Sequence, residues 1–274
     1  MAQTESLQFQ LLSCRVEVAF DDPALEATLQ YMAETAEQTC AVRKTLRYAV
    51  EGSGPYAVFE EGDPLGRWES PGDVLYVIYG RVYRRVLERF MLARWVVLHA
   101  ALANIKGTRT LLLGDKGAGK TTLSTRLLFD GHDVEGDETV LVRNGLALAL
   151  PRRFHFKPNI ERQVPELADA VADLPKTYAG PTEVSAFDPA VHGFPWKIAV
   201  GPIDRVVWIT ANHGGETALV PQASFPMIQF ILKSAIEWGE TRDLLVAVAT
   251  EIAGKGGFEL ILGNAADAAK LLAE

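Results

Sequence analysis

The first third of the chain carries both strand-like and helix-like hydrophobic patterns. Apolar and polar residues alternate over residues 12–20, which is the period of a half-buried strand. Asp22 and Pro23 then predict the start of a helix, and further strand-like runs occupy residues 45–50 and 56–59. A Gly-Ser-Gly-Pro turn separates these two runs and favours a hairpin. Residues 1–95 are therefore expected to form an α+β domain.

A helix is predicted over residues 73–94, because apolar side chains recur there every three or four residues. Glycine and proline predict loops before it, at residues 61–64 and 71–72. Four arginines share much of the opposite helix face, namely Arg81, Arg84, Arg85 and Arg89. We expect these to form a solvated basic face, and the alternative is a docking surface for an acidic partner or substrate.

Strands and helices alternate beyond Trp95. Strands are predicted over residues 96–105, 110–113, 139–142, 146–150, 154–156, 205–210 and 258–262. Helices are predicted over residues 121–129, 225–238, 241–253 and 265–273. This alternation favours an α/β core over a helical bundle or a β-sandwich. The sequence thus predicts two domains, residues 1–95 and residues 96–274.

Composition and charge narrow the class of protein. Hydrophobic residues make up 48% and charged residues 23%, as in ordinary globular proteins. A net charge of −8 would be repelled by nucleic acids and anionic membranes, so neither partner is expected. No stretch resembles a signal peptide or a spanning helix, and Cys14 and Cys40 are too few for a disulfide framework. We expect a cytoplasmic protein with reduced thiols.

The strongest motif is the loop of residues 114–122, which matches the pattern G-x-x-x-x-G-K-[ST] completely. Its glycines let successive amides converge on one anion, and the helix that follows adds its positive end. Lys120 would reach the β and γ oxygens of a nucleotide, and the Thr121 hydroxyl would ligate Mg²⁺. The expected nucleotide contacts are Gly114, Asp115, Lys116, Gly117, Ala118, Gly119, Lys120, Thr121 and Thr122. The motif predicts ATP as donor, and leaves GTP and pyrophosphate open.

An acidic pair, Asp137 and Glu138, follows the predicted helix after this loop. The pair precedes an apolar run, so we expect both carboxylates beside the phosphate loop, where they would join Thr121 around Mg²⁺. The preceding segment is not the long apolar strand ending in Asp that many motor and transporter ATPases carry. The sequence therefore disfavours those ATPase classes.

A basic cluster lies near residue 155. The period of a strand would place Arg153, His155 and Lys157 on one face, where Arg153 and Lys157 could bind a phosphate or neutralise the transferred phosphoryl group. The alternative is an edge strand with solvated charges. The histidines here and at 192 and 213 share no metal-ligand spacing, so no zinc site is predicted.

Residues 96–157 resemble the catalytic core of HPr kinase/phosphorylase and its HPr-kinase-related relatives, a group allied to phosphoenolpyruvate carboxykinase. Three features carry the resemblance. His99 ends a predicted strand upstream of the loop, the loop begins Gly-Asp and ends Gly-Lys-Thr, and the acidic pair follows a Gly-His turn at Gly131 and His132. The resemblance implies an α/β fold with a P-loop kinase core of this type, preceded by a smaller α+β domain.

The same resemblance implies roles for individual residues. Asp137 would be the general base that takes the proton from the attacking hydroxyl, and Lys120 would contact the phosphates. Glu138 stands where the family usually has a second Asp and would support Mg²⁺ or the base, while His99 would orient the acidic pair. The Arg-Gly-x-Gly stretch of the bifunctional enzymes is absent, and residues 176–201 occupy its place, so a kinase without phosphorylase activity is implied.

Three functions follow from these features. The first is an ATP- and Mg²⁺-dependent kinase that phosphorylates Ser or Thr of a peptide or protein. The second is a small-molecule kinase acting on free serine or a sugar hydroxyl, and the third is a nucleotide-binding switch ATPase. The acidic pair disfavours the switch, which needs no base aimed at an acceptor. The N-terminal domain, expected to recognise a substrate or partner, favours a macromolecular acceptor. The oligomeric state is left open, with a homo-oligomer as one possibility.

Overall fold

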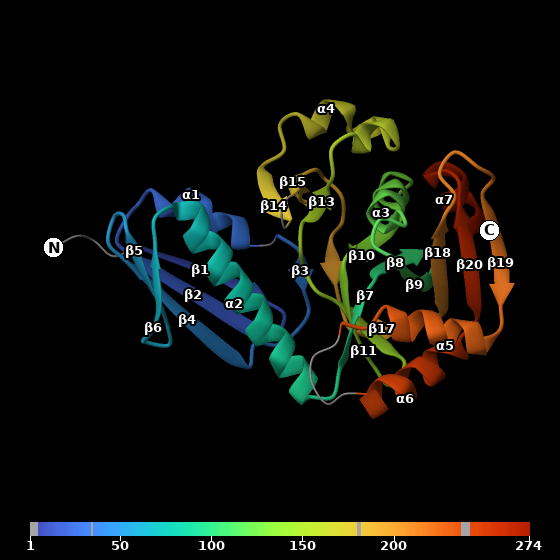
Figure 1. Ribbon diagram of the computed structural model, residues 1–274, viewed down its shortest axis with the longest axis horizontal. Coiled ribbons are helices and arrows are strands. Elements are labelled where there is room, and N and C mark those ends of the chain that lie inside the picture. Colours follow the sequence, from blue (N-terminus) through green and yellow to red (C-terminus); the bar gives the residue numbers. More distant parts are fainter. Residues whose placement is uncertain (1–4, 34, 180–181, 237–241) are drawn as a thin grey trace. The chain divides into compact units, whose positions relative to one another are not determined.

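The protein is a mixed α/β structure with several sheets, and the computed structural model describes residues 5–33, 35–179, 182–236 and 242–274. The chain divides into two compact units, Met1–Ala93 and Arg94–Glu274 (Figure 1). The roles expected of the two domains stay predictions. Within the described residues, no helix combines the length and apolar character needed to cross a membrane.

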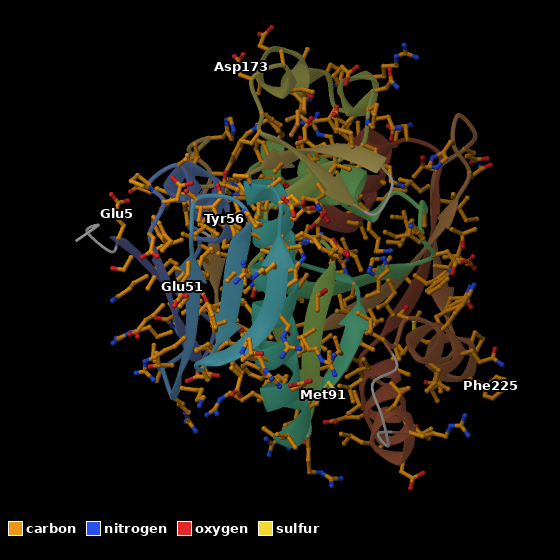
Figure 2. All side chains as sticks on the ribbon, turned by 60° about the vertical axis from the view of Figure 1, so that its left-hand side comes forward. Glu5, Glu51, Tyr56, Met91, Asp173 and Phe225 are labelled. Carbon is orange, nitrogen blue, oxygen red and sulfur yellow. The ribbon has the colours of Figure 1, made fainter. Side chains whose placement is uncertain are left out.

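A five-stranded sheet in the order β1-β2-β4-β5-β6 forms the first unit. Its strands are β1 (Glu5–Leu11), β2 (Cys14–Phe20), β4 (Lys44–Glu51), β5 (Tyr56–Glu60) and β6 (Asp63–Trp68). β2 and β4 run parallel, and the other neighbours are antiparallel. The remaining elements are α1 (Leu25–Leu29), η1 (Gln30–Met32), β3 (Glu37–Gln38) and α2 (Pro71–Leu92). Tyr56, labelled in Figure 2, is buried, and its hydroxyl donates to Asp22 Oδ2 at 2.9 Å.

The hairpin predicted from residues 45–59 is confirmed, because β4 and β5 pair antiparallel. The two loops predicted after it are wrong in part. Asp63 and Pro64 begin β6, an edge strand in which a proline is tolerated. Pro71 and Gly72 lie in the first turn of α2, where the Ser70 hydroxyl accepts a hydrogen bond from the Asp73 amide at 3.2 Å.

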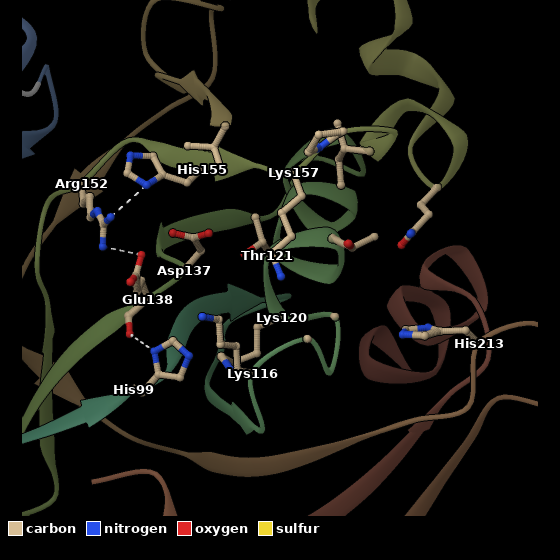
Figure 3. A pocket seen from close by; sticks show the side chains of 17 residues that line it. His99, Lys116, Lys120, Thr121, Asp137, Glu138, Arg152, His155, Lys157 and His213 are labelled. Atoms are coloured by element: carbon tan, nitrogen blue, oxygen red, sulfur yellow. Dashed lines mark hydrogen bonds and ion pairs between the residues drawn. The ribbon is translucent and has the colours of Figure 1, made fainter. Parts of the chain in front are cut away.

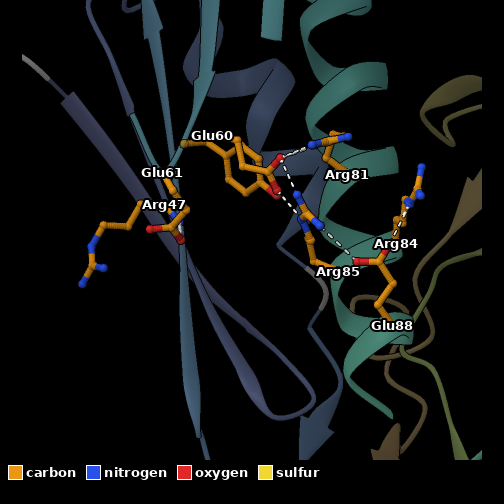
Figure 4. A network of polar contacts seen from close by, with 8 residues as sticks. Arg47, Glu60, Glu61, Arg81, Arg84, Arg85 and Glu88 are labelled. Atoms are coloured by element: carbon orange, nitrogen blue, oxygen red, sulfur yellow. Dashed lines mark hydrogen bonds and ion pairs between the residues drawn. The ribbon is translucent and has the colours of Figure 1, made fainter. Parts of the chain in front are cut away.

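The arginines of α2 do not form a purely solvated face. Glu60, at the end of β5, is only 6% exposed, and it accepts from Arg81 Nε at 2.9 Å and from Arg85 Nε at 2.7 Å (Figure 4). The Tyr48 hydroxyl donates to the same carboxylate at 3.2 Å. Burial acts to raise the pKa of Glu60, but the two guanidinia outweigh it and hold that pKa below its usual value. The cluster fastens α2 to the sheet, whereas Arg84 stays on the exposed side.

Replacing Glu60 with Gln is expected to lower the free energy of unfolding of the first unit by about 2 kcal/mol, because two guanidinia lose their buried countercharge. The value is smaller than for a fully buried cluster, since both arginines are partly exposed. Hydrogen exchange followed by mass spectrometry should become faster in β5 and α2 and stay unchanged in Arg94–Glu274. Glu51→Gln, at the exposed end of β4, is the control. Unchanged exchange in α2 of the Glu60 variant would contradict this role.

The second unit is organised around a six-stranded sheet in the order β10-β8-β9-β18-β20-β19. The strands are β8 (Ala101–Ile105), β9 (Thr108–Gly114), β10 (Asp133–Gly136), β18 (Arg205–Ala211), β19 (Ala218–Gln222) and β20 (Gly257–Leu262). β9, β18 and β20 run parallel, so their carboxyl ends meet at one edge. The remaining pairs are antiparallel.

Helices cover both faces of this sheet (Figure 1). α3 (Lys120–Phe129) and α7 (Ala265–Ala273) pack together on one face, where Val207 and Ile209 of β18 join their apolar core. α5 (Ser224–Lys233) lies on the other face beside α6 (Arg242–Ala253). There Trp208 stacks on Phe230, with ring centroids 4.5 Å apart. Successive residues of β18 thus pack alternately against the helices on the two faces of the sheet.

Two smaller sheets complete the second unit. One has the order β17-β12-β11-β7 and consists of β7 (Val96–His99), β11 (Thr139–Arg143), β12 (Leu146–Ala149) and β17 (Gly201–Pro202). The other has the order β13-β15-β14, with β13 (Phe154–Phe156), β14 (Lys176–Ala179) and β15 (Thr182–Phe187). The short elements are η2 (Ile160–Arg162), η3 (Pro165–Leu167), α4 (Ala168–Val171) and β16 (Lys197–Ile198).

The structure corrects two predictions in this unit. The single strand expected over residues 96–105 is two strands in different sheets, because the chain turns at Ala100, whose amide donates to the Glu138 carbonyl at 3.1 Å. The helix expected over residues 225–238 ends at Lys233, and Ala235 forms a β-bridge with Leu98. Residues 237–241, where that predicted helix ends and the next begins, lie outside the described residues, as do Gly180 and Pro181.

Candidate functional site

The 114–122 loop joins the carboxyl end of β9 to the first turn of α3. Gly117 and Gly119 have φ angles of 88° and 103°, a left-handed region that favours glycine. A Cβ atom on Gly119 would also lie 2.5 Å from Leu262 Cδ2. The loop therefore needs glycine here for its conformation and its packing, and it brings backbone amides to the positive end of α3.

Lys120 lies back on the loop that precedes it. Its side chain is 5% exposed, and Nζ donates to the carbonyl oxygens of Gly114 at 2.7 Å and Asp115 at 3.3 Å. Burial lowers the pKa of Lys120 to about 8, although the acids Asp137 and Glu138 act to raise it. Both of these acceptors are neutral carbonyl oxygens, and a charged phosphate oxygen would form a stronger hydrogen bond with the ammonium.

Asp137 follows β10, which is fixed by a buried ion pair. Arg109 of β9 donates to both carboxylate oxygens of Glu135 in β10, at 2.6 and 2.7 Å, and the Trp196 indole donates to the Glu135 carbonyl at 3.0 Å. Asp137 itself is 6% exposed. Burial raises its pKa to about 7, the Glu138 charge adds to the rise, and a hydrogen bond with Thr121 opposes it. A carboxyl group that titrates near neutral pH suits a general base.

Glu138 belongs to a chain of polar contacts on the other side of Asp137. Arg152 forms an ion pair with its carboxylate and donates from Nη2 to His155 Nδ1 at 2.8 Å (Figure 3). His99 donates from Nδ1 to the Glu138 carbonyl oxygen at 3.0 Å. Burial lowers the pKa of His99 and brings that of His155 to about 4, so both rings are neutral at pH 7. The ion pair and the neutral rings leave this end of the site with little net charge.

These side chains line one cavity of about 610 Å³. Of the residues predicted from the sequence, the cavity wall includes His99, Lys116, Gly117, Gly119, Lys120, Thr121, Thr122, Asp137, Glu138 and Lys157. Gly114, Asp115 and Ala118 belong to the same loop but do not line the cavity, and Asp115 pairs instead with Lys233 at 2.7 Å. The fold thus brings His99, the glycine-rich loop and the acidic pair together around one cavity.

The basic cluster is placed differently from the prediction. Arg153 was expected beside His155 and Lys157, but it pairs with Asp188 at 3.5 Å and does not line the cavity. The predicted alternation of side chains along a strand does not extend to Arg153, because β13 begins only at Phe154. Arg152 takes the place in the wall instead.

A sequence signal for Arg152 exists in the preceding hairpin. The Asn-Gly turn at residues 144–145 sets the register of β11 and β12, which pairs Val140 with Ala149. Continuing this register past the strand ends sets Pro151 opposite Glu138 and Arg152 opposite Asp137. The turn therefore indicates that Arg152 lies near the acidic pair, but it does not identify Glu138 as the acid that Arg152 contacts.

Two of the three residues expected to hold Mg²⁺, Thr121 and Asp137, fit that ion in their chemistry, whereas the carboxylate of the third, Glu138, is paired with Arg152. Asp137 and Thr121 are hydrogen-bonded to each other and offer oxygen donors, which Mg²⁺ prefers. No group of three His, Cys, Asp or Glu side chains suited to a metal ion occurs in the described part of the chain.

Comparisons with known proteins give limited information. No family model and no curated protein matches the sequence. Among solved structures, the chain is similar to the HPr(Ser) kinase/phosphatase from Coxiella burnetii, with a TM-score of 0.33 and 11% sequence identity. That match covers 65% of this chain and 91% of the other. Similarity at this level does not assign the chain to a family.

Proposed function

We propose that the protein is an ATP- and Mg²⁺-dependent kinase that transfers the γ-phosphoryl group to a Ser or Thr hydroxyl of a peptide or protein. The observation that carries the proposal is the position of Asp137. This buried carboxyl group, with a pKa of about 7, shares one cavity with Lys120 and Thr121 of the glycine-rich loop. The resemblance of residues 96–157 to HPr-kinase-related enzymes supports the same reaction.

The proposed step is an in-line displacement. The acceptor oxygen forms a bond to the γ-phosphorus while the bond from that phosphorus to the β–γ bridging oxygen breaks. Asp137 takes the hydroxyl proton, and ADP leaves with the electron pair. Lys120 binds β and γ oxygens, and the Thr121 hydroxyl would hold Mg²⁺, which would neutralise phosphate charge.

Arg152 and His99 act on this step through Glu138. Arg152 neutralises the Glu138 carboxylate, and His99 holds the backbone of the same residue. Two adjacent ionised carboxylates would repel each other and the phosphates, so the guanidinium makes the pair compatible with a polyanionic substrate. Both residues are therefore positioning residues in this proposal.

The acceptor is a peptide or protein in this proposal because the chain devotes a separate α+β unit, Met1–Ala93, to something other than the nucleotide site. A free amino acid or a sugar would need no such recognition surface. The alternative that the α2 arginines dock an acidic segment of the acceptor stays a prediction, and two of them, Arg84 and Arg85, form ion pairs with Glu88.

The test is transfer of labelled phosphate from γ-labelled ATP with Mg²⁺ into Ser- and Thr-containing peptide libraries and into a dialysed lysate. Labelled peptide or protein, identified by mass spectrometry, supports the proposal. Label in a metabolite would make the protein a small-molecule kinase. Label in inorganic phosphate alone would make it an ATPase. Both of these results contradict a peptide acceptor.

A further inference from the structure

A tightly held turn follows β18 at the carboxyl edge of the parallel strands. Residues 212–217 connect β18 to β19 and lie against the end of β20. The Asn212 amide donates to the Leu262 carbonyl at 2.9 Å, and the Gly214 amide donates to the Gly263 carbonyl at 3.0 Å. In return, the Gly263 amide donates to Thr217 Oγ1 at 3.1 Å. These bonds fix the turn to the sheet.

Close backbone packing adds to this rigidity. A Cβ atom built on Gly263 would lie 2.0 Å from the Gly215 carbonyl oxygen, so no larger residue fits there. The turn also closes on itself, because Asn212 Nδ2 donates to the Glu216 carbonyl at 3.0 Å. A side chain carried by this turn is therefore held in a defined place before any ligand arrives.

His213 is the side chain that this turn presents to the cavity. The residue is exposed and lines the cavity wall, and its Cε1 lies 3.8 Å from the Cβ position built on Gly119. Figure 3 shows His213 on one side of the glycine-rich loop and Asp137 on the other. The imidazole thus stands beside the loop at the end of the cavity away from the acidic pair.

The direction of the bound nucleotide follows from this arrangement. The γ-phosphoryl group must face Asp137, which receives the acceptor proton, and the β-phosphate must lie on the loop amides near Lys120. The α-phosphate, ribose and base must then extend away from Asp137, toward His213. Ligands of open α/β sheets bind at the carboxyl ends of the parallel strands, which is where this turn lies.

We propose that His213 recognises the nucleoside part of the donor by stacking its imidazole ring against the base. This inference rests on the proposed function and adds a specificity-determining residue to it. A flat ring on a fixed turn loses little conformational freedom when a base stacks on it. The same contact would make a nucleotide a better donor than an inorganic polyphosphate, which has no base.

The test compares the binding of Mg²⁺-ATP with that of Mg²⁺-tripolyphosphate by isothermal titration calorimetry. His213→Ala is expected to weaken ATP binding about five-fold or more, the usual scale of base stacking, and to leave tripolyphosphate binding unchanged. His213→Phe, which keeps a flat ring, is expected to retain ATP binding. His132→Ala, in the turn after α3 and outside the cavity wall, is the control and should change neither ligand.

If His213→Ala weakens the binding of ATP and of tripolyphosphate equally, the imidazole contacts phosphate. If His213→Ala leaves ATP binding unchanged, the imidazole does not contact the nucleotide. Either result overturns the inference. Loss of ATP binding in His213→Phe would overturn stacking as the mode of contact. These failures leave the phosphate site intact. Failure of the proposed function looks different. If the phosphate site is wrong, the unaltered protein binds neither ATP nor tripolyphosphate, and if the acceptor is wrong, ATP binding is kept and the failure appears only in the transfer assay.

Discussion

Asp137→Asn is expected to slow phosphoryl transfer roughly 10²–10⁴-fold while nucleotide binding is kept. The amide has nearly the shape of the carboxylate and can still pair with Thr121, but it cannot accept the hydroxyl proton. Single-turnover transfer from γ-labelled ATP measures the loss, and calorimetry measures the affinity for ATP in the presence of Mg²⁺.

A matched control is Asp133→Asn, at the exposed start of β10, which should transfer phosphate at the native rate. Transfer by Asp137→Asn at the native rate would show that another group receives the proton. Loss of ATP binding together with transfer would place Asp137 in ground-state binding of the metal or nucleotide rather than in proton transfer.

The same variant should be more stable than the native protein at pH 8 without ligand and with a chelator present. The folded-state pKa of Asp137, about 7, lies above the ordinary value of 3.8. Between these pH values the folded protein holds a proton that the unfolded chain has released, so native stability falls as pH rises through this window. The penalty is on the order of 4 kcal/mol above pH 7.

Urea unfolding at pH 5 and pH 8 tests this expectation. Asn carries no charge, so the variant should lose less stability than the native protein between the two values. If the free energy of unfolding depends on pH identically in the two proteins, the Asp137 carboxylate is well solvated in the folded state or its charge is balanced by neighbouring cations.

Lys120→Ala is expected to reduce transfer at least about 10²-fold and to weaken binding of ATP and of tripolyphosphate together. The ammonium is the charged donor that the loop directs at the phosphates, whereas the loop amides contribute only partial charges. Filter-binding or calorimetric affinities for both ligands, with single-turnover transfer rates, give the measurement.

Stability provides the control for this variant. The Lys120 side chain is buried with a lowered pKa, so its removal relieves a desolvation penalty and should not unfold the protein. Lys106→Ala, in the hairpin turn between β8 and β9, should leave binding and transfer unchanged. Native ATP affinity in a folded Lys120→Ala protein would contradict the phosphate-binding role of the loop.

Local patterns predicted much of the fold because their causes are local. The hairpin of residues 45–59 and the strand, glycine loop and helix around Lys120 depend on side-chain alternation and on backbone conformations that glycine permits. The break at Ala100 depends instead on a hydrogen bond to the distant Glu138 carbonyl. No pattern within residues 96–105 indicates that hydrogen bond, so the sequence predicted one continuous strand instead of two.

The arginines of α2 also combine a local feature, which the sequence predicts, with a tertiary feature, which it does not. Their spacing correctly predicts one helix face, yet the burial of Glu60 between Arg81 and Arg85 depends on how the sheet packs on that face. A run of charges in a sequence does not reveal whether a countercharge lies beneath it.

The sequence alone was sufficient to predict the glycine-rich loop, the helix that follows it and the acidic pair, since these are short-range features of neighbouring residues. Only the tertiary structure decided that Arg152 rather than Arg153 faces the acids, that Asp137 is buried enough to titrate near pH 7, and that His213 stands at the other end of the cavity. Desolvation and charge pairing depend on groups far apart in the chain, and their distances are set by strand order and packing.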